Sequence, residues 1–388
     1  MSLPHFPRVY LGILCVAMAA TSCDRRAKPV SQTRPAARPS LLSQNAPADR
    51  AADDAGRFLA GIPGTPGSPF LPLEQTPEWS RHSRELNQDW ASIEAQAIVA
   101  MKRFRSAALQ RDGIGDTTVF YPFSGPDALM VSVFFPDCPT YILVGLEPPG
   151  TLPSPSAIES KNLEFYLSEV RETIFSELHR SFFITREMDH QFRGQVSDGL
   201  LPTILNLLVR SGHSIAGYRS VSVGLDGTLA GRTPGDSLPH GVQVDFRRES
   251  APVQRLYYFS VNLADSRLGK NKAFLNFLSR LSGVTTYMKA TSYMPHHRDF
   301  QLIGRLVLNR SAAILQDDSG IPYRDFDARW HVQLFGSYDH PYGSFKWLKQ
   351  ADLKRAYQTQ NPIPLGFRIG YGYSKVPSNL MLAVRKQR

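Results

Sequence analysis

The chain has 388 residues, of which 42% are hydrophobic and 11% aromatic, and its formal net charge is +10. This composition excludes a largely disordered protein and supplies enough apolar side chains for a large core. A basic surface attracts anionic lipids, nucleic acids and acidic polysaccharides. Because no dense basic run is interleaved with aromatic residues, the sequence predicts no specific nucleic-acid binding.

Residues 1–22 have the pattern of an export signal. Arg8 precedes an uncharged, mostly apolar run over 9–20, and small residues follow before Cys23. A basic flank, about 12 apolar residues and a small-residue cleavage point are typical of a secretory signal peptide, whereas a membrane-spanning helix needs about 20 apolar residues. The segment Ala20-Thr21-Ser22-Cys23 resembles the cleavage site of bacterial lipoproteins, which implies removal of residues 1–22 and lipidation of Cys23.

From this resemblance we expect an exported protein of the cell envelope, anchored to a membrane through acyl chains such as palmitate and facing the periplasm or the surface. Ordinary secretion, with a cysteine nearby by chance, is the alternative. The other two cysteines are Cys15, inside the signal, and Cys138. After processing and lipidation only Cys138 remains free, so no internal disulfide is expected.

Residues 23–74 are predicted to be a disordered tether. Between Asp24 and Asp54 the chain is rich in Ala, Pro, Arg, Ser and Gln and has few aromatic or β-branched residues. Such a segment buries too little apolar area to offset the entropy of ordering, and Pro and Gly punctuate residues 64–72. Because no second segment of this kind follows, we expect a single domain over 75–388.

Hydrophobic periodicity predicts alternating helices and strands in this domain. Apolar residues at three- and four-residue spacing indicate helices, and short apolar or alternating runs bounded by turn residues indicate strands. The predicted helices span 90–109, 127–135, 163–179, 200–210, 272–281 and 300–308. The predicted strands span 118–121, 140–146, 218–223, 256–261, 312–315, 330–334, 366–373 and 380–384.

Strands that alternate with helices predict a mostly parallel sheet with helices on both faces. The alternating strands near the C-terminus add an antiparallel edge. The expected fold class is therefore α/β, a three-layer, Rossmann-like domain with a mostly parallel sheet and an antiparallel C-terminal edge.

Residues 119–147 hold the strongest candidate site. A strand ends at Tyr121, a turn and a helix start follow, and the next strand ends just before Glu147. In an open parallel sheet, ligands bind beyond the carboxyl ends of the strands, and a helix start offers unpaired amides. We therefore expect a polar cleft whose lining includes Ser124, Gly125, Asp127 and Glu147.

The same segment weakly resembles the first βαβ unit of Rossmann-type methyltransferases. The resemblance implies that Gly125 lies against a cofactor and that Glu147 holds its ribose hydroxyls. It covers about thirty residues, and Pro122 and Pro126 surround a single glycine where the family has two or three. An exported protein would also lack the cytoplasmic methyl donor. We favour a purely structural interpretation, in which Asp127 caps a helix and Glu147 ends a strand, and no cofactor is assigned.

Asp317-Asp318-Ser319-Gly320 follows another predicted strand. Acids at a strand tip can bind a cation or act as acid and base, but adjacent carboxylates in a strand point to opposite faces. Asp317 is therefore a candidate to join the cleft from a third strand end. We favour the alternative, an Asx-type turn that closes a hairpin to the 330–334 strand. The stretches 287–289 and 292–293 are further candidates to line a cleft.

Familiar catalytic motifs are absent from the sequence. Prolines flank Ser124 where a nucleophile elbow needs glycines, and no His-Glu-x-x-His or other metal-ligand spacing occurs. Three functions stay open. The first is a tethered lipoprotein whose domain binds a small ligand or a partner. The second is an envelope hydrolase that uses strand-end carboxylates, and the third is a catalytically degenerate, methyltransferase-like scaffold.

Overall fold

The computed structural model describes residues 49–110, 114–159, 162–180, 199–232, 240–373 and 377–386. The predicted signal peptide, the predicted lipidation site Cys23 and the predicted tether before residue 49 lie outside these ranges. Among the described residues, no helix is both long enough and apolar enough to cross a membrane.

The described residues form helices and strands that largely alternate. The helices are α1 (Arg50–Leu59), α2 (Leu71–Glu74), α3 (Pro77–Ile93), α4 (Val99–Phe104), α5 (Ala128–Phe134), α6 (Pro155–Glu159), α7 (Leu163–Arg180), α9 (Leu201–Arg210), α10 (Asp265–Leu268), α11 (Lys272–Arg280), α12 (Gln301–Arg310) and α13 (Ala351–Thr359). The strands are β1 (Thr118–Tyr121), β2 (Thr140–Gly145), β3 (Ser214–Val223), β4 (Leu229–Gly231), β5 (His240–Arg247), β6 (Gln254–Ser260), β7 (Val284–Met288), β8 (Ser311–Gln316), β9 (Trp330–Gly336) and β10 (Asn379–Arg385).

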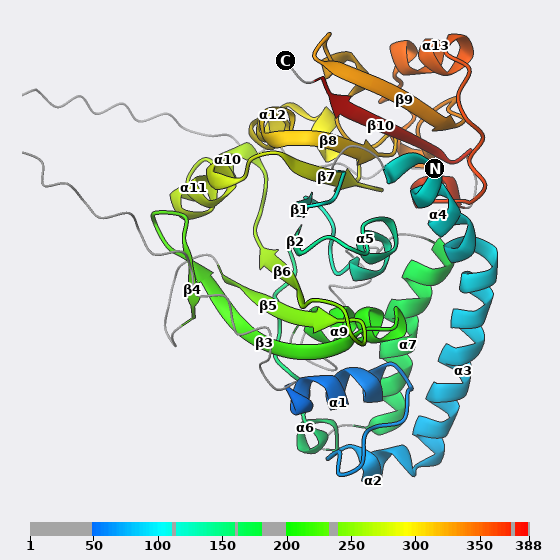
Figure 1. Cartoon of the computed structure of the whole chain (residues 1–388), viewed down its shortest axis with the longest axis vertical. Coiled ribbons are helices and arrows are strands. Elements are labelled where there is room, and N and C mark those ends of the chain that lie inside the picture. Colours follow the sequence, from blue (N-terminus) through cyan, green and yellow to red (C-terminus); the bar gives the residue numbers. More distant parts are fainter. Residues whose placement is uncertain are drawn as a thin grey trace, which may run out of the picture. The chain divides into compact units, whose positions relative to one another are not determined.

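These strands form one sheet in the order β4-β3-β5-β6-β2-β1-β7-β8-β10-β9 (Figure 1). The five central strands, β6, β2, β1, β7 and β8, are parallel. Along the chain they come third, second, first, fourth and fifth, so the sheet grows outward from β1 in both directions, as in doubly wound folds. Towards the C-terminus, β10 is antiparallel to both β8 and β9. The predicted fold class is confirmed.

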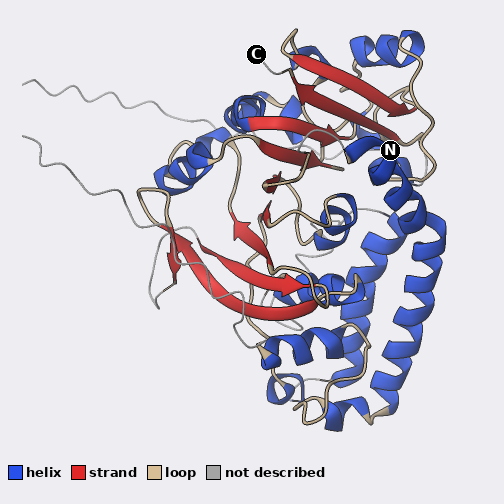
Figure 2. Cartoon of the chain, viewed as in Figure 1, coloured by secondary structure: helices blue, strands red, loops and turns tan. Residues whose placement is uncertain are grey.

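Helices cover both faces of the central strands, which makes three layers (Figure 2). In β1, Val119 and Tyr121 belong to one apolar core, and Phe120 belongs to the other. The first core includes residues of α5 and α9, and the second includes residues of α11 and α12. Since both faces of these strands are buried, β1 and β2 are mostly apolar and do not alternate with polar residues.

The folded region begins earlier than predicted. Helix α1 falls within the segment predicted to be a tether, yet Ala55, Phe58 and Leu59 are fully buried. The helix packs against α9 and β3, and a side chain at Gly56 would come within 2.9 Å of the Val209 side chain. Small residues thus allow a close approach that composition alone does not reveal, and the boundary predicted at residue 75 is wrong.

Two further expectations are corrected near the C-terminus. The predicted strand over 366–373 instead ends in a short 3₁₀ helix, Gly370–Tyr373, where the Ser378 hydroxyl accepts a hydrogen bond from the backbone N–H of Ile369. A side-chain hydroxyl thereby accepts the hydrogen bond that a backbone carbonyl of a neighbouring strand would otherwise accept. No hairpin joins β8 to β9, because β10 lies between them.

Candidate functional site

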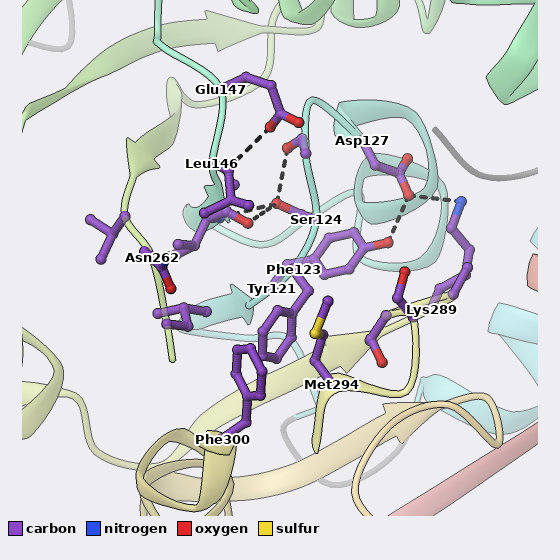
Figure 3. A pocket seen from close by; sticks show the side chains of 18 of the residues that line it. Tyr121, Phe123, Ser124, Asp127, Leu146, Glu147, Asn262, Lys289, Met294 and Phe300 are labelled. Carbon is purple, nitrogen blue, oxygen red and sulfur yellow. Dashed lines mark hydrogen bonds and ion pairs between the residues drawn. The ribbon is translucent and has the colours of Figure 1, made fainter. Parts of the chain in front are cut away.

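A cavity of about 250 Å³ lies beyond the carboxyl ends of β1, β2, β6 and β7 (Figure 3). Its lining comes from the segments that follow these strands, within 121–127, 144–147, 261–264 and 289–292, together with Met294 and Phe300. β1 and β7 are neighbours where the strand order changes direction. This is the place at which doubly wound sheets bind their ligands.

Asp127 and Lys289 form a buried ion pair at the side of the cavity. The Lys289 Nζ lies 2.9 Å from Asp127 Oδ2, and the two side chains are 2% and 1% exposed. The same carboxylate accepts hydrogen bonds from the Tyr121 hydroxyl at 2.9 Å and from the backbone N–H of Met130 at 3.0 Å. Asp127 therefore caps α5 and neutralises a lysine that could not be buried alone without a large cost.

Ser124 joins the ends of two strands. Its backbone N–H donates to the Val144 carbonyl, and its hydroxyl accepts from the Val144 N–H at 3.0 Å. The hydroxyl also donates to the Gly125 carbonyl at 2.9 Å. Both residues line the cavity, and Gly125 has a φ of 54°. The Ser124 hydroxyl thus extends the pairing of β1 with β2 rather than pointing freely at a ligand.

Glu147 brings a carboxylate to the cavity from the end of β2. Its Oε2 accepts a hydrogen bond from the Leu146 N–H at 3.1 Å, and its main-chain carbonyl accepts from the Tyr258 hydroxyl at 2.8 Å. These contacts fix both its backbone and its side chain, which Figure 3 shows beside the Ser124 turn. A carboxylate held in this way can accept further hydrogen bonds from hydroxyl or amino groups.

Another part of the wall is apolar. The rings of Phe123 and Phe300 meet edge to face, with centroids 5.7 Å apart, and Val261, Leu263 and Met294 complete this side. Leu146 also lines the cavity and is 58% exposed. Within the described ranges, no group of three or more His, Cys, Asp or Glu side chains is placed to hold a metal ion. The combination of a mostly apolar wall with a few fixed polar groups is typical of small-molecule sites.

Asp317 lies behind the cavity and is not part of its lining. Its Oδ1 accepts from the Ser319 N–H at 3.0 Å, which is the predicted Asx-type turn. Its Oδ2 accepts at 2.8 Å from the backbone N–H of Ala290, a residue that does line the cavity. Burial raises the pKa of Asp317, and the Ser319 hydroxyl, these amides and the Lys289 charge oppose that rise. The prediction that Asp317 reaches the cleft directly is therefore wrong.

The cavity coincides with strained backbone. Of the five non-glycine residues with positive φ in the described ranges, Phe123, Ala290 and Ser292 line the cavity, and Tyr293 is adjacent. For a non-glycine residue, the left-handed backbone conformation costs roughly 1–2 kcal/mol of free energy. Such residues persist only where surrounding contacts hold them, and they concentrate at ligand sites.

Four predicted residues, Ser124, Gly125, Asp127 and Glu147, thus line one cavity, as does Lys289 from the stretch 287–289. The segment 261–264 was missed, although its position directly after a buried strand was a usable signal. Phe300 was also missed, because an apolar residue at a helix start gives no sign that it faces a ligand.

Comparison with known proteins gives no match to this chain among family models, curated proteins or solved structures.

Proposed function

We propose that the domain binds a small organic ligand that combines a flat aromatic ring with neighbouring hydroxyl groups. The observation that carries this proposal is the cavity at the change in strand order, with a fixed carboxylate, Glu147, on one side and an aromatic pair on the other. The ring would lie against Phe123 and Phe300, and Glu147 would accept hydrogen bonds from the hydroxyls.

The resemblance of residues 119–147 to Rossmann-type methyltransferases supports the same ligand class. In that family an acid after the second strand holds ribose hydroxyls, and Glu147 follows β2. The turn after β1 departs from the family because it has one glycine and a buried Asp127–Lys289 pair beside it. We therefore propose a binding domain of methyltransferase-like ancestry and assign it no methyl transfer.

A hydrolase that uses strand-end carboxylates is less well supported. Asp127 already accepts three contacts, from Lys289, Tyr121 and Met130. Asp317 is engaged by two backbone amides and the Ser319 hydroxyl. Carboxylates engaged in this way are poorly placed to take a proton from a substrate or a water molecule. Of the three predicted strand-end acids this leaves Glu147, to which the proposed function gives a binding role, so ligand binding is the function that the geometry favours.

We further propose that this domain works in the cell envelope, held to a membrane by lipid on Cys23. The support is the sequence pattern of residues 1–23 alone.

The proposal is tested by calorimetry with adenosine, which carries a ring and two adjacent hydroxyls, and with 2′,3′-dideoxyadenosine, which lacks the hydroxyls. Glu147→Gln should weaken adenosine binding roughly tenfold or more, because a neutral amide replaces the charged acceptor of the hydroxyls, and should leave the weaker dideoxyadenosine binding unchanged. The exposed Glu249→Gln is the matched control. Equal affinities for the two nucleosides, or no binding of adenosine, would contradict the proposed ligand class.

A further inference from the structure

The segment Lys289–Tyr293, which forms one wall of the cavity, is held by side chains from other parts of the chain. The Ala290 N–H donates to Asp317 and the Thr291 N–H donates to the Ser319 hydroxyl, at 2.8 and 2.9 Å. The Ser292 N–H donates to the Tyr371 hydroxyl at 3.1 Å. Three successive amides of a strained segment therefore all find side-chain acceptors, where a strand or helix would have used backbone acceptors.

These acceptors are themselves fixed. The Ser319 hydroxyl donates to Asp317 Oδ1 at 2.5 Å, so Asp317 supports two of the three contacts. The Tyr371 hydroxyl also lies 3.2 Å from the Ala290 carbonyl, to which it donates. Its ring stacks on Tyr342 and on Tyr293, with interplanar angles of 9° and 3°.

Gly370, the residue before Tyr371, lies directly against the Asp317 carboxylate. Gly370 has a φ of 56°, and a Cβ there would come within 2.5 Å of Asp317 Oδ2. Glycine therefore allows the 370–373 segment to lie against the Asp317 carboxylate, which in turn brings the Tyr371 hydroxyl to the strained segment.

We infer that Asp317, Ser319 and Tyr371 are positioning residues, which hold Lys289–Tyr293 in its strained form so that the cavity exists before a ligand arrives. None of the three lines the cavity. The inference rests on the proposed function in one respect, namely that this cavity binds the ligand. A wall fixed in advance spares a ligand the entropy of ordering it.

Two matched pairs of variants test the inference without any ligand. Tyr371→Phe removes a hydroxyl bonded to Ser292 and Ala290, whereas Tyr357→Phe removes a buried hydroxyl bonded to the Phe335 and Leu380 carbonyls. Ser319→Ala removes the hydroxyl that accepts from the Thr291 N–H. Its control, Ser311→Ala, removes a buried hydroxyl at the start of β8, 2.7 Å from the Thr286 hydroxyl.

Hydrogen exchange followed by mass spectrometry on peptides covering 289–293 gives the readout. Tyr371→Phe and Ser319→Ala should speed exchange in this segment roughly tenfold, since a hydrogen bond of ordinary strength is lost at one amide. Tyr357→Phe and Ser311→Ala should leave it unchanged, even where they lower the unfolding temperature as much. Unchanged exchange in Tyr371→Phe and Ser319→Ala, or equal changes in these two variants and in their controls, would overturn the inference.

The affinity for adenosine separates this inference from the proposed function. If the inference and the proposed function both hold, Tyr371→Phe and Ser319→Ala weaken adenosine binding about fivefold or more, because the wall is less ordered. The controls Tyr357→Phe and Ser311→Ala do not weaken it. If wild-type protein does not bind adenosine, the proposed ligand class fails while the exchange result still decides the inference. If adenosine binds but Tyr371→Phe and Ser319→Ala leave its affinity unchanged, the order of Lys289–Tyr293 does not matter for binding, and the inference is wrong.

Discussion

Single residues show where sequence reasoning succeeds and where it stops. Asp127 and Glu147 were predicted as strand-end acids, and both line the cavity. The partner of Asp127 could not be predicted, because Lys289 lies far along the chain and meets it only once β7 pairs beside β1. Asp317 was placed at the correct sheet edge, but which way its carboxylate points is decided by local turn contacts.

The neighbouring acid gives a prediction on pH dependence. Burial, and then the charge of Asp317, raises the pKa of Asp318 to about 7, whereas an aspartate in an unfolded chain titrates near pH 4 (about 3.9). Between about pH 4 and pH 7 the native state keeps a proton that the unfolded chain has released. The free energy of unfolding should therefore fall as the pH rises through this range, by an amount on the order of a few kcal/mol.

Asp318→Asn mimics the protonated acid and should remove this part of the pH dependence. Urea denaturation at several pH values from about 4.5 to 8 should show the variant gaining stability relative to wild type as the pH rises. Comparing variant with wild type cancels the opposite contribution of His82, whose pKa burial lowers to about 3. A constant difference across the pH range would show that Asp318 ionises normally.

At the scale of elements, apolar patterns located most of the central strands and their helices. β4, β5 and β7 were missed. Thr285, Thr286 and Tyr287 in β7 are all buried, but two threonines in five residues give a weak apolar signal. Helix α1 was misread because Ala, Asp and Arg dominate its composition. Its last carbonyls, those of Phe58 and Leu59, accept from Trp79, His82 and Asn206, contacts that no local pattern announces.

Truncation tests the corrected boundary. A chain starting at residue 49 should unfold cooperatively with nearly the same stability as one containing residues 23–388. A chain starting at 75 loses the buried side chains of Phe58, Leu59, Phe70 and Leu73. Each contributes about 1.5–3 kcal/mol, so their sum rivals a typical domain stability of about 5–15 kcal/mol. Urea denaturation followed by circular dichroism gives the comparison, and equal midpoints for the two truncated chains would restore the boundary at 75.

At the scale of the described chain, the parallel centre and the C-terminal antiparallel edge follow the pattern of alternating elements. The antiparallel pairing of β3, β4 and β5 at the opposite end was not expected, although a strand was predicted over 218–223, within β3. They are inserted between β2 and β6, which nevertheless pair directly. Sequence order cannot reveal such an insertion, because neighbouring strands in the sheet are then not successive in the chain.

Membrane anchoring is a prediction for the whole protein. If Cys23 carries lipid, the mature protein should enter the detergent phase in a phase-partition assay, because several acyl chains bind a membrane firmly. Cys23→Ala should stay in the aqueous phase or remain as uncleaved precursor, while Cys138→Ala, the control, should behave as wild type. Mass spectrometry that finds an unmodified mature N-terminus at another residue would contradict lipidation.

The sheet order has a consequence for how the protein folds. The four strand ends around the cavity belong to pairings such as Val119 with Thr285 and Thr140 with Arg255, which join residues well over a hundred positions apart. Contacts between such distant residues close large loops and make folding slow. The cavity therefore cannot form until the chain has been synthesised as far as Phe300, the last residue of its lining, and, if the protein is exported, has crossed the membrane. Binding of a ligand at this site would therefore show that β1, β2, β6 and β7 have paired in that molecule.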